Sequence, residues 1–145
     1  MPILTAPLTT AGPVVTLLIG VSAPRAAALQ AAHQPVPALV QIQALIDSGA
    51  SSTCIVAGAL QSLSLVPTGV THITTPSTGS NPVRCNQYDV GVFVAHPTIT
   101  LGQVTMPIIE CQPLGGSIQG LLGRDFLRMC LFVYDGLAQR FSLGI

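Results

Sequence analysis

The chain has 145 residues, of which 49% are hydrophobic and only 7% charged, and its five basic and five acidic residues leave no formal net charge. Without a basic cluster, nucleic acid is not expected as a partner, and no apolar run approaches the ~18 residues of a membrane-spanning helix. The length predicts one domain, residues 1–145, and the high apolar content predicts exposed apolar surface that a partner covers.

Short apolar or alternating runs, separated by glycine and proline, predict an all-β fold of the sandwich or barrel type. In chain order, the predicted strands are residues 14–21, 38–46, 83–95 and 98–109, followed by a hairpin at residues 131–143. The hairpin contains Asp135-Gly136, a pair that favours a tight turn between two strands. Residues 23–37 are rich in alanine but end in two prolines, and we expect them to be mainly loop.

One segment departs from the β pattern. In IQGLLGRDFLRMCL, residues 118–131, an apolar strand runs into Gly123, and the next apolar residues recur at helical spacing. The residues of this apolar face are Phe126, Leu127, Cys130 and Leu131. A strand, a glycine turn and one short helix near the C-terminus are predicted here.

The N-terminal segment and the cysteines indicate the cellular setting. No positive charge precedes Arg25, so the first residues do not resemble a secretory signal. The four cysteines are widely spaced and form no Cys-x-x-Cys pair, which predicts free, buried thiols and no metal site. They are Cys54, Cys85, Cys111 and Cys130. We therefore expect a cytoplasmic protein without a cofactor.

The stretch ALIDSGAS, residues 44–51, places one of the five acids at the end of an apolar strand. The small residues after Asp47 allow a sharp turn and a close approach by a ligand or another chain. Taken alone, Asp-Ser-Gly fits either of two roles. In one, the carboxylate only caps a turn by accepting from the N–H of Gly49 or Ala50; in the other, it is presented to a substrate.

Two separated motifs together resemble the aspartic proteases of the retroviral type, the retropepsins. They are ALIDSGAS and GLLGRDFL, residues 120–127, and the chain between them is long enough for a flap hairpin. The resemblance extends over about residues 14–145. It implies a retropepsin-like closed β-barrel or sandwich with a flap hairpin and a short C-terminal helix. The flap candidate is residues 71–85, which taken alone would be an ordinary polar β-turn.

The family's chemistry gives Asp47 its predicted role. Two facing aspartates share one proton, so that one activates a water while the other donates to the scissile carbonyl oxygen. Since the chain holds a single Asp-Ser-Gly, the second aspartate must come from a second copy, which implies a homodimer with Asp47 of each protomer at the two-fold axis. The predicted function is an aspartic endopeptidase that cleaves extended peptides with apolar residues around the scissile bond.

The resemblance also assigns supporting residues. Ser48 would hydrogen-bond across the dimer beneath the carboxylates, beside Gly49 and Ala50. The predicted substrate contacts are Gly49, Ala50 and Ser51, with Thr78, Gly79 and Ser80 near the flap tip. The predicted structural motif is Leu121, Leu122, Gly123, Arg124 and Asp125. Some viral members hold an acid at the position of Ser51 that pairs with Arg124, so this ion pair is expected to be missing.

Other readings stay open. Asp125 is expected to be an acid in the first turn of a helix rather than a catalyst, and His33, His72 and His96 are too scattered for a metal site or a catalytic triad. An alternative function is a catalytically weak or inactive retropepsin-like dimer that binds peptides or scaffolds other proteins. A third is a half-domain that pairs with a different protein.

Overall fold

The computed structural model describes residues 1–76, 78–96, 99–100 and 104–145. Its elements follow one another along the chain in this order: β1 (Ile3–Pro7), β2 (Val14–Val21), α1 (Ala23–Ala31), β3 (Val40–Ile46), β4 (Cys54–Val56), α2 (Ala57–Leu60), the 3₁₀ turn η1 (Gln61–Leu63), β5 (Gly69–Ile73), β6 (Val83–His96), β7 (Ile99–Thr100), β8 (Val104–Cys111), β9 (Gly120–Leu122), α3 (Arg124–Leu127), β10 (Leu131–Asp135) and β11 (Arg140–Gly144).

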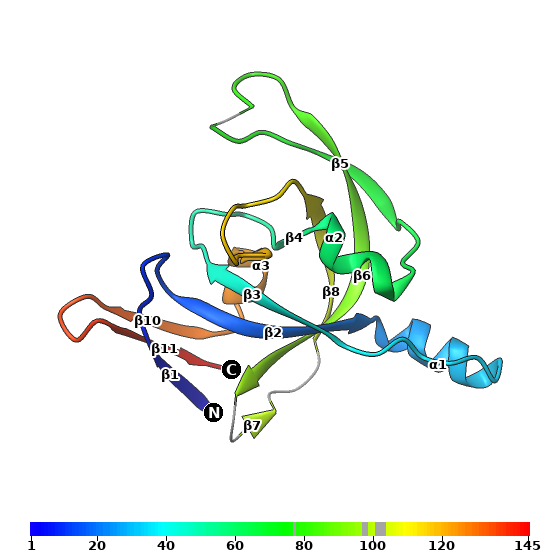
Figure 1. The fold of residues 1–145 in the computed structure, drawn as a ribbon, viewed down its shortest axis with the longest axis horizontal. Helices are drawn as coiled ribbons and strands as arrows, with labels where there is room; N and C mark the ends of the chain where they lie inside the picture. The colour runs from blue at the N-terminus through cyan, green and yellow to red at the C-terminus, as the bar shows by residue number, and fades with distance from the viewer. Residues whose placement is uncertain (77, 97–98, 101–103) are drawn as a thin grey trace.

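Six strands close into a barrel (Figure 1). Hydrogen bonds join β2, β3, β9, β4, β8 and β6 in that order, and β2 also pairs with β6, which completes the ring. The pairs β3–β9 and β4–β8 are parallel, while the other pairs of the ring are antiparallel. Closure leaves these strands without free edges. The predicted all-β closed barrel is confirmed.

Alternating side chains of the barrel strands form the core. Residues two apart on a strand point to the same face, and on β2 the alternation buries Val15, Leu17 and Ile19 almost completely. They meet Ile42 and Ala44 of β3, Val90, Val92 and Val94 of β6, and Ile108 of β8. Burial of each valine, leucine or isoleucine side chain stabilises the fold by about 1.5–3 kcal/mol. Because these side chains fill the interior, the barrel is packed and is not a channel.

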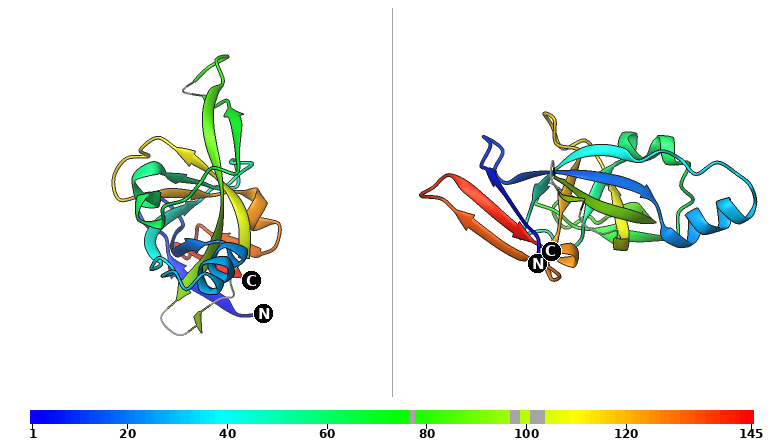
Figure 2. Two further views of the ribbon diagram at one scale, coloured as in Figure 1. Left: turned by 90° about the vertical axis from the view of Figure 1, so that its right-hand side faces the viewer. Right: turned by 90° about the horizontal axis from the view of Figure 1, so that it is seen from below.

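A second, three-stranded sheet joins the two ends of the chain. Its order is β1-β11-β10, and the termini lie beside each other (Figure 2). Leu4, Phe141 and Leu143 point to the core, and their neighbours point outward. On the outward face, the side chains of Ile3 and Leu131 are about half exposed. This sheet therefore presents apolar surface on its outer side.

Most strand predictions are confirmed. Residues 14–21 are β2, residues 83–95 lie within β6, and the C-terminal hairpin forms β10 and β11 around the predicted turn. Of the predicted strand 98–109, residues 98 and 101–103 lie outside the described residues, and the rest belongs to β7 and β8.

The prediction that residues 23–37 are mainly loop is wrong, because Ala23–Ala31 form the helix α1. The Ser22 hydroxyl caps the helix by accepting from the N–H of Arg25 (3.4 Å). Pro24 falls in the first turn, where its missing N–H has no helical partner to lose, and alanine favours helix. The two prolines that suggested a loop come after the helix. α1 projects from the barrel and buries none of its side chains (Figure 1).

The helix predicted within residues 118–131 is shorter than the apolar spacing indicated. α3 ends at Leu127, and the N–H groups of Met129 and Cys130 donate to carbonyls three residues back, which tightens the last turn. Leu131 then begins β10, because pairing with β11 prevails over local helical spacing.

A further helical segment was not predicted from the sequence. Residues 57–63 form α2 and η1, which bury Leu60 and Leu63 against the barrel.

Nothing in the described part of the chain is a helix of the length and apolarity needed to cross a bilayer.

Candidate active site

Asp47 begins the loop that follows β3 and is half-buried there. Its backbone N–H donates to the carbonyl of Leu122 (3.0 Å), which ties the start of the loop to β9. The N–H of Gly49 donates to Asp47 Oδ1 (2.8 Å), and the N–H of Ala50 donates to the Asp47 carbonyl (3.1 Å). The turn-capping role is therefore present, but it uses one carboxylate oxygen. Within the described residues, Oδ2 has no hydrogen-bond partner.

Thr53 connects this loop to the start of α3. Its side chain is 1% exposed. The Thr53 hydroxyl donates to Asp125 Oδ1 (2.7 Å) and accepts from the N–H of Gly123 (3.0 Å), while its backbone N–H donates to Asp125 Oδ2 (2.8 Å). Asp125 Oδ1 also accepts from the N–H of Phe126 (2.9 Å). Asp125 lies in the first turn of α3, as predicted, and both of its oxygens hold the loop in place.

Gly123 lets the two segments cross at close range. A Cβ atom at this position would lie 2.6 Å from the carbonyl carbon of Ser52 and 2.9 Å from the backbone nitrogen of Thr53. Those atoms belong to the backbone, so no side-chain rotation would make room. Only glycine fits at position 123, because the crossing leaves no room for a side chain. The same crossing sets the position of the loop that carries Asp47.

Arg124 has no acid at position 51 to pair with, and it donates to backbone carbonyl oxygens instead. Its Nη1 donates to the carbonyl oxygens of Ser48 (2.9 Å) and Gly49 (3.2 Å), and its backbone N–H donates to the carbonyl of Ala50 (2.9 Å). The described residues hold no ion pair of Arg124 with a carboxylate. The guanidinium thus fixes the Ser48–Gly49 backbone directly.

Comparison with known proteins bears on this arrangement. The aspartyl protease family matches the chain over residues 38–126, a span that contains both the Asp47 loop and the start of α3. This chain belongs to the aspartyl protease family. No curated protein matches it significantly. Among solved structures, the crystal structure of a retropepsin-like aspartic protease from Rickettsia conorii is similar, with a TM-score of 0.55 and 14% identity over 98% of this chain and 89% of that chain. This likeness shows the shared fold.

In this family member, the predicted structural motif lies beneath the Asp47 loop. Leu122 is fully buried, and Leu121 is half-buried between Leu45 of β3 and Cys54 of β4. The structure therefore brings residues 47–51 and 121–125 together, although they are far apart in the sequence.

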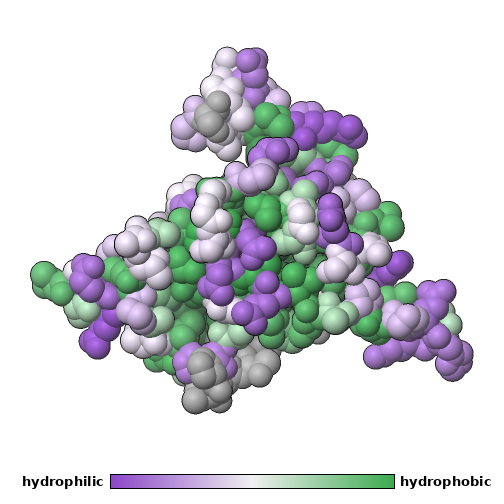
Figure 3. Space-filling model, in the orientation of Figure 1, coloured by the Kyte–Doolittle hydropathy of each residue, from purple (hydrophilic) through white to green (hydrophobic). Residues whose placement is uncertain are grey.

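The predicted flap residues lie in a different part of the structure from the Asp47 loop. Thr78, Gly79 and Ser80 belong to the turn region between β5 and β6, which projects from the barrel (Figure 1). The N–H of Thr78 donates to the Thr75 carbonyl (3.0 Å), and Gly79 adopts a φ of 59°, which favours glycine. In the described chain no hydrogen bond joins this turn to residues 47–51. In the space-filling view the tip stands away from the body and leaves an open recess beneath it (Figure 3).

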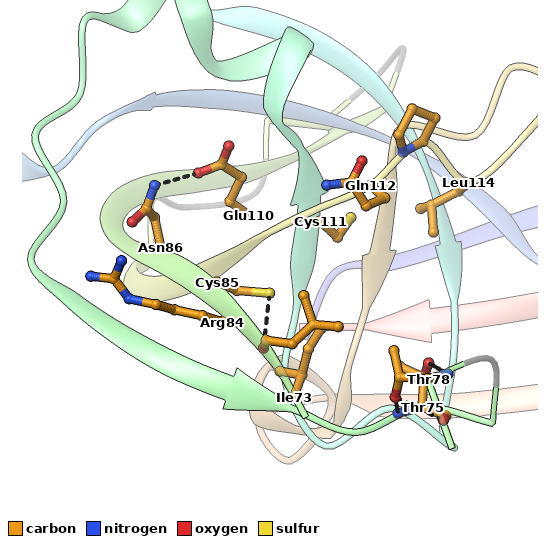
Figure 4. Close-up of a pocket in the computed structure, with 12 residues that line it drawn as sticks. Ile73, Thr75, Thr78, Arg84, Cys85, Asn86, Glu110, Cys111, Gln112 and Leu114 are labelled. Atoms are coloured by element: carbon orange, nitrogen blue, oxygen red, sulfur yellow. Dashed lines mark hydrogen bonds between the residues drawn. The ribbon is translucent and has the colours of Figure 1, made fainter. Parts of the chain in front are cut away.

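A cavity lies at the base of this hairpin. Its volume is about 580 Å³, and its walls come from the β5–β6 hairpin and from the end of β8 with the loop after it (Figure 4). At its side, Asn86 Nδ2 and the Tyr88 hydroxyl each donate to Glu110 Oε2 (3.0 Å). Burial raises the pKa of the Tyr88 hydroxyl, and the hydrogen bond to Glu110 raises it further. Asp47 does not line the cavity.

Sequence reasoning missed two features of the site. In the sequence, Thr53 follows Ser51 and Ser52 and carries a hydroxyl group as they do. Only its position directly before the apolar run CIV, residues 54–56, distinguishes it. The cysteines are free, as predicted, but they are half-buried and not fully buried. Three of them gather near the cavity, because strands distant in sequence are neighbours in the barrel.

Proposed function

We propose that this chain is one protomer of a homodimeric aspartic endopeptidase whose active site forms from Asp47 of each copy. The observation that carries the proposal is the single Asp-Ser-Gly loop, anchored through Thr53, Gly123 and Arg124. Among the residues that the structure describes, one oxygen of Asp47 has no hydrogen-bond partner. A loop fixed on both sides holds a carboxylate in a defined place, as catalysis requires.

The chemistry divides two roles between two carboxylates. Asp47 of one protomer takes a proton from a water, and the water oxygen attacks the scissile carbonyl carbon. The partner's Asp47, protonated, donates to the carbonyl oxygen. The tetrahedral intermediate then collapses: the first Asp47 gives the proton it took from water to the amide nitrogen, the partner's Asp47 takes up a hydroxyl proton of the intermediate, and the C–N bond breaks to leave a carboxylic acid and an amine. A lone carboxylate cannot be base and acid in the same step, so a second copy is needed.

The outer surface supports association with a second copy. Leu137, at the turn of the β10–β11 hairpin, is completely exposed, and Ile3, Leu131 and Val133 on the outward face of the terminal sheet are about half exposed. Apolar surface of this kind on a chain with 7% charged residues favours a protein partner.

The substrate we propose is an extended peptide that lies between the Asp47 loop and the β5–β6 hairpin. Ser48, Gly49 and Ser51 are exposed on the loop side. The carbonyl of Gly49 accepts from Arg124 with one lone pair, which leaves the second for a peptide N–H. Thr78, Gly79 and Ser80 would close over the peptide from above, and Ile73, Val83 and Leu114 give the cavity apolar walls suited to apolar side chains.

Peptidase activity should depend on chain concentration. Because one protomer holds half of the proposed site, specific activity should fall as the protein is diluted through its dimer dissociation constant. The measurement pairs peptide cleavage with sedimentation velocity over the same concentrations, and a diluted sample that is reconcentrated should regain its activity.

A protein that sediments as a monomer and keeps full specific activity would refute the shared site. A dimer that binds peptides but cleaves none at any concentration would favour the alternative function, a peptide-binding or scaffolding module.

A further inference from the structure

Glu110 stands at a position on β8 where the strand pattern predicts an apolar core residue. Side chains two apart on a strand share a face, and the residues two and four before Glu110 are Ile108 and Met106, both buried in the core. Glu110 is half-buried at the end of this row. A charged side chain on the core face costs free energy unless a partner compensates it, which makes this position a candidate for a function.

The partners that the structure gives Glu110 are neutral. Asn86 Nδ2 and the Tyr88 hydroxyl, both on the neighbouring strand β6, donate to Oε2 at 3.0 Å. Within the described residues, Oε1 accepts no hydrogen bond and no ion pair includes Glu110. The guanidinium of Arg84, also on β6, points in a different direction from the Glu110 carboxylate (Figure 4). In the described part of the chain, this carboxylate therefore lacks a counter-charge.

Glu110 also lines a second cavity, of about 210 Å³, between residues 57–65 and the strands β6 and β8. Residues 57–65 give this cavity an apolar wall made of Ala57, Leu60 and Leu65. Its polar groups are Gln61, Ser64, Tyr88 and Glu110. Of the described residues in 47–51 and 71–85, none lines this cavity, so it is separate from the Asp47 loop and from the flap candidate.

The hydrogen bonds of Glu110 select the kind of cation that fits. A carboxylate oxygen accepts at about two lone-pair sites, and Asn86 and Tyr88 occupy those of Oε2. A guanidinium pairs best with both oxygens of a carboxylate at once, which this arrangement does not offer. An ammonium is a compact charge with three donors. One N–H bonds to Oε1, and the hydroxyl oxygens of Tyr88 and Ser64 at the same cavity are acceptors for the other two.

We propose that this second cavity binds a primary ammonium group on a short alkyl stem, with Glu110 as the acceptor and the apolar wall against the stem. A cavity of about 150 Å³ holds the six heavy atoms of benzene. In the same proportion, a cavity of about 210 Å³ holds roughly eight heavy atoms, which is enough for pentylamine or for a lysine side chain. The ligand is either a free alkylamine or the side chain of a lysine in a peptide, since both present the same group.

The test titrates the full ¹⁵N-labelled chain with n-pentylamine at pH 7 and constant ionic strength, and follows the backbone amide signals by NMR. We expect saturable shifts at residues 57–65, 86–88 and 110, with a dissociation constant on the order of 1 mM, as for a ligand of this size. n-Pentanol, which has the same stem without the charge, should bind at least about tenfold more weakly, because a hydrogen bond to a charged group is the stronger kind.

Glu110→Gln removes the charge and keeps a carbonyl oxygen that accepts from Asn86 and Tyr88. This variant should bind pentylamine about tenfold more weakly or worse. Asp89→Asn is the matched control, because Asp89 is an exposed acid on β6 that does not line the cavity. It should bind as the natural chain does. Asp47→Asn should also bind unchanged, so the site stands or falls independently of the proposed peptidase.

A second ligand, Nα-acetyl-lysine amide, distinguishes the two sources. Shifts at the same residues, at least as tight as those of pentylamine, assign the site to a lysine side chain of a peptide. Pentylamine binding without binding of the lysine derivative assigns it to a free amine.

Three results would overturn the site. They are the absence of saturable shifts with pentylamine, shifts centred on residues 47–51, and equal affinity in Glu110→Gln and the natural chain. If Glu110→Gln does not fold, the comparison of pentylamine with pentanol on the natural chain decides, and equal affinities for the two would refute the role of the charge.

Discussion

Replacing Asp47 with asparagine should abolish peptide cleavage while leaving the fold and the dimer in place. The asparagine carbonyl oxygen still accepts from the N–H of Gly49, so the loop keeps its turn. The side chain no longer takes a proton from water, and loss of a general acid–base group lowers rates by about 10²–10⁴-fold. The measurement is kcat/KM on a cleaved peptide, together with far-UV circular dichroism and sedimentation velocity.

The matched control for this change is Asp89→Asn. Asp89 lies on β6, is exposed, and has no place in the proposed site. The control removes the same charge and should leave kcat/KM unchanged. Cleavage by Asp47→Asn at the rate of the control would remove Asp47 from the mechanism.

Replacing Gly123 with alanine should have the largest effect on stability among single-methyl changes near the site. The added Cβ would lie 2.6 Å from the backbone of Ser52, so the loop and the start of α3 must separate. Overpacking of this kind costs about 1–3 kcal/mol, and the movement also strains the hydrogen bond that the Gly123 N–H donates to the Thr53 hydroxyl. Urea unfolding at one fixed protein concentration measures the loss, and activity should fall with it.

Gly58→Ala is the control for the Gly123 variant. Gly58 lies in α2, where an added Cβ would meet no atom within 4 Å. Alanine favours helix over glycine by about 1 kcal/mol, so this variant should be as stable as the natural chain or slightly more stable. If Gly123→Ala unfolds at the same urea concentration as Gly58→Ala, the close crossing does not constrain the loop.

Local patterns in the sequence were sufficient to predict much of the barrel. Alternation along β2 and β6 and the Asp135-Gly136 turn depend on neighbours in sequence, so these elements were predicted close to their observed bounds. The helix α1 was not predicted, because the two prolines that follow it favour a loop, whereas its Ser22 cap and first-turn proline favour a helix. α3 was predicted too long because pairing with β11, a non-local contact, takes over at Leu131.

The candidate site was predictable where a short motif carried it. Asp47, Gly123 and Arg124 stood out in the two motifs, and their proximity followed from the resemblance. The bond between Thr53 and Asp125 was not predictable, because no local pattern pairs residues on two separate segments. The thiol cluster was missed for the same reason, since only strand order and register bring Cys54, Cys85 and Cys111 together.

The central claim, one active site built from two copies of Asp47, is tested most directly by mixing subunits. A fixed amount of the natural chain, at a concentration where it is dimeric, is equilibrated with increasing amounts of Asp47→Asn, and cleavage is measured. A mixed dimer holds one catalytic carboxylate, so activity should fall to about half at equal amounts, as random pairing predicts, and approach zero in excess variant. Activity that stays constant at every ratio, while sedimentation shows that subunits exchange, would contradict the shared site.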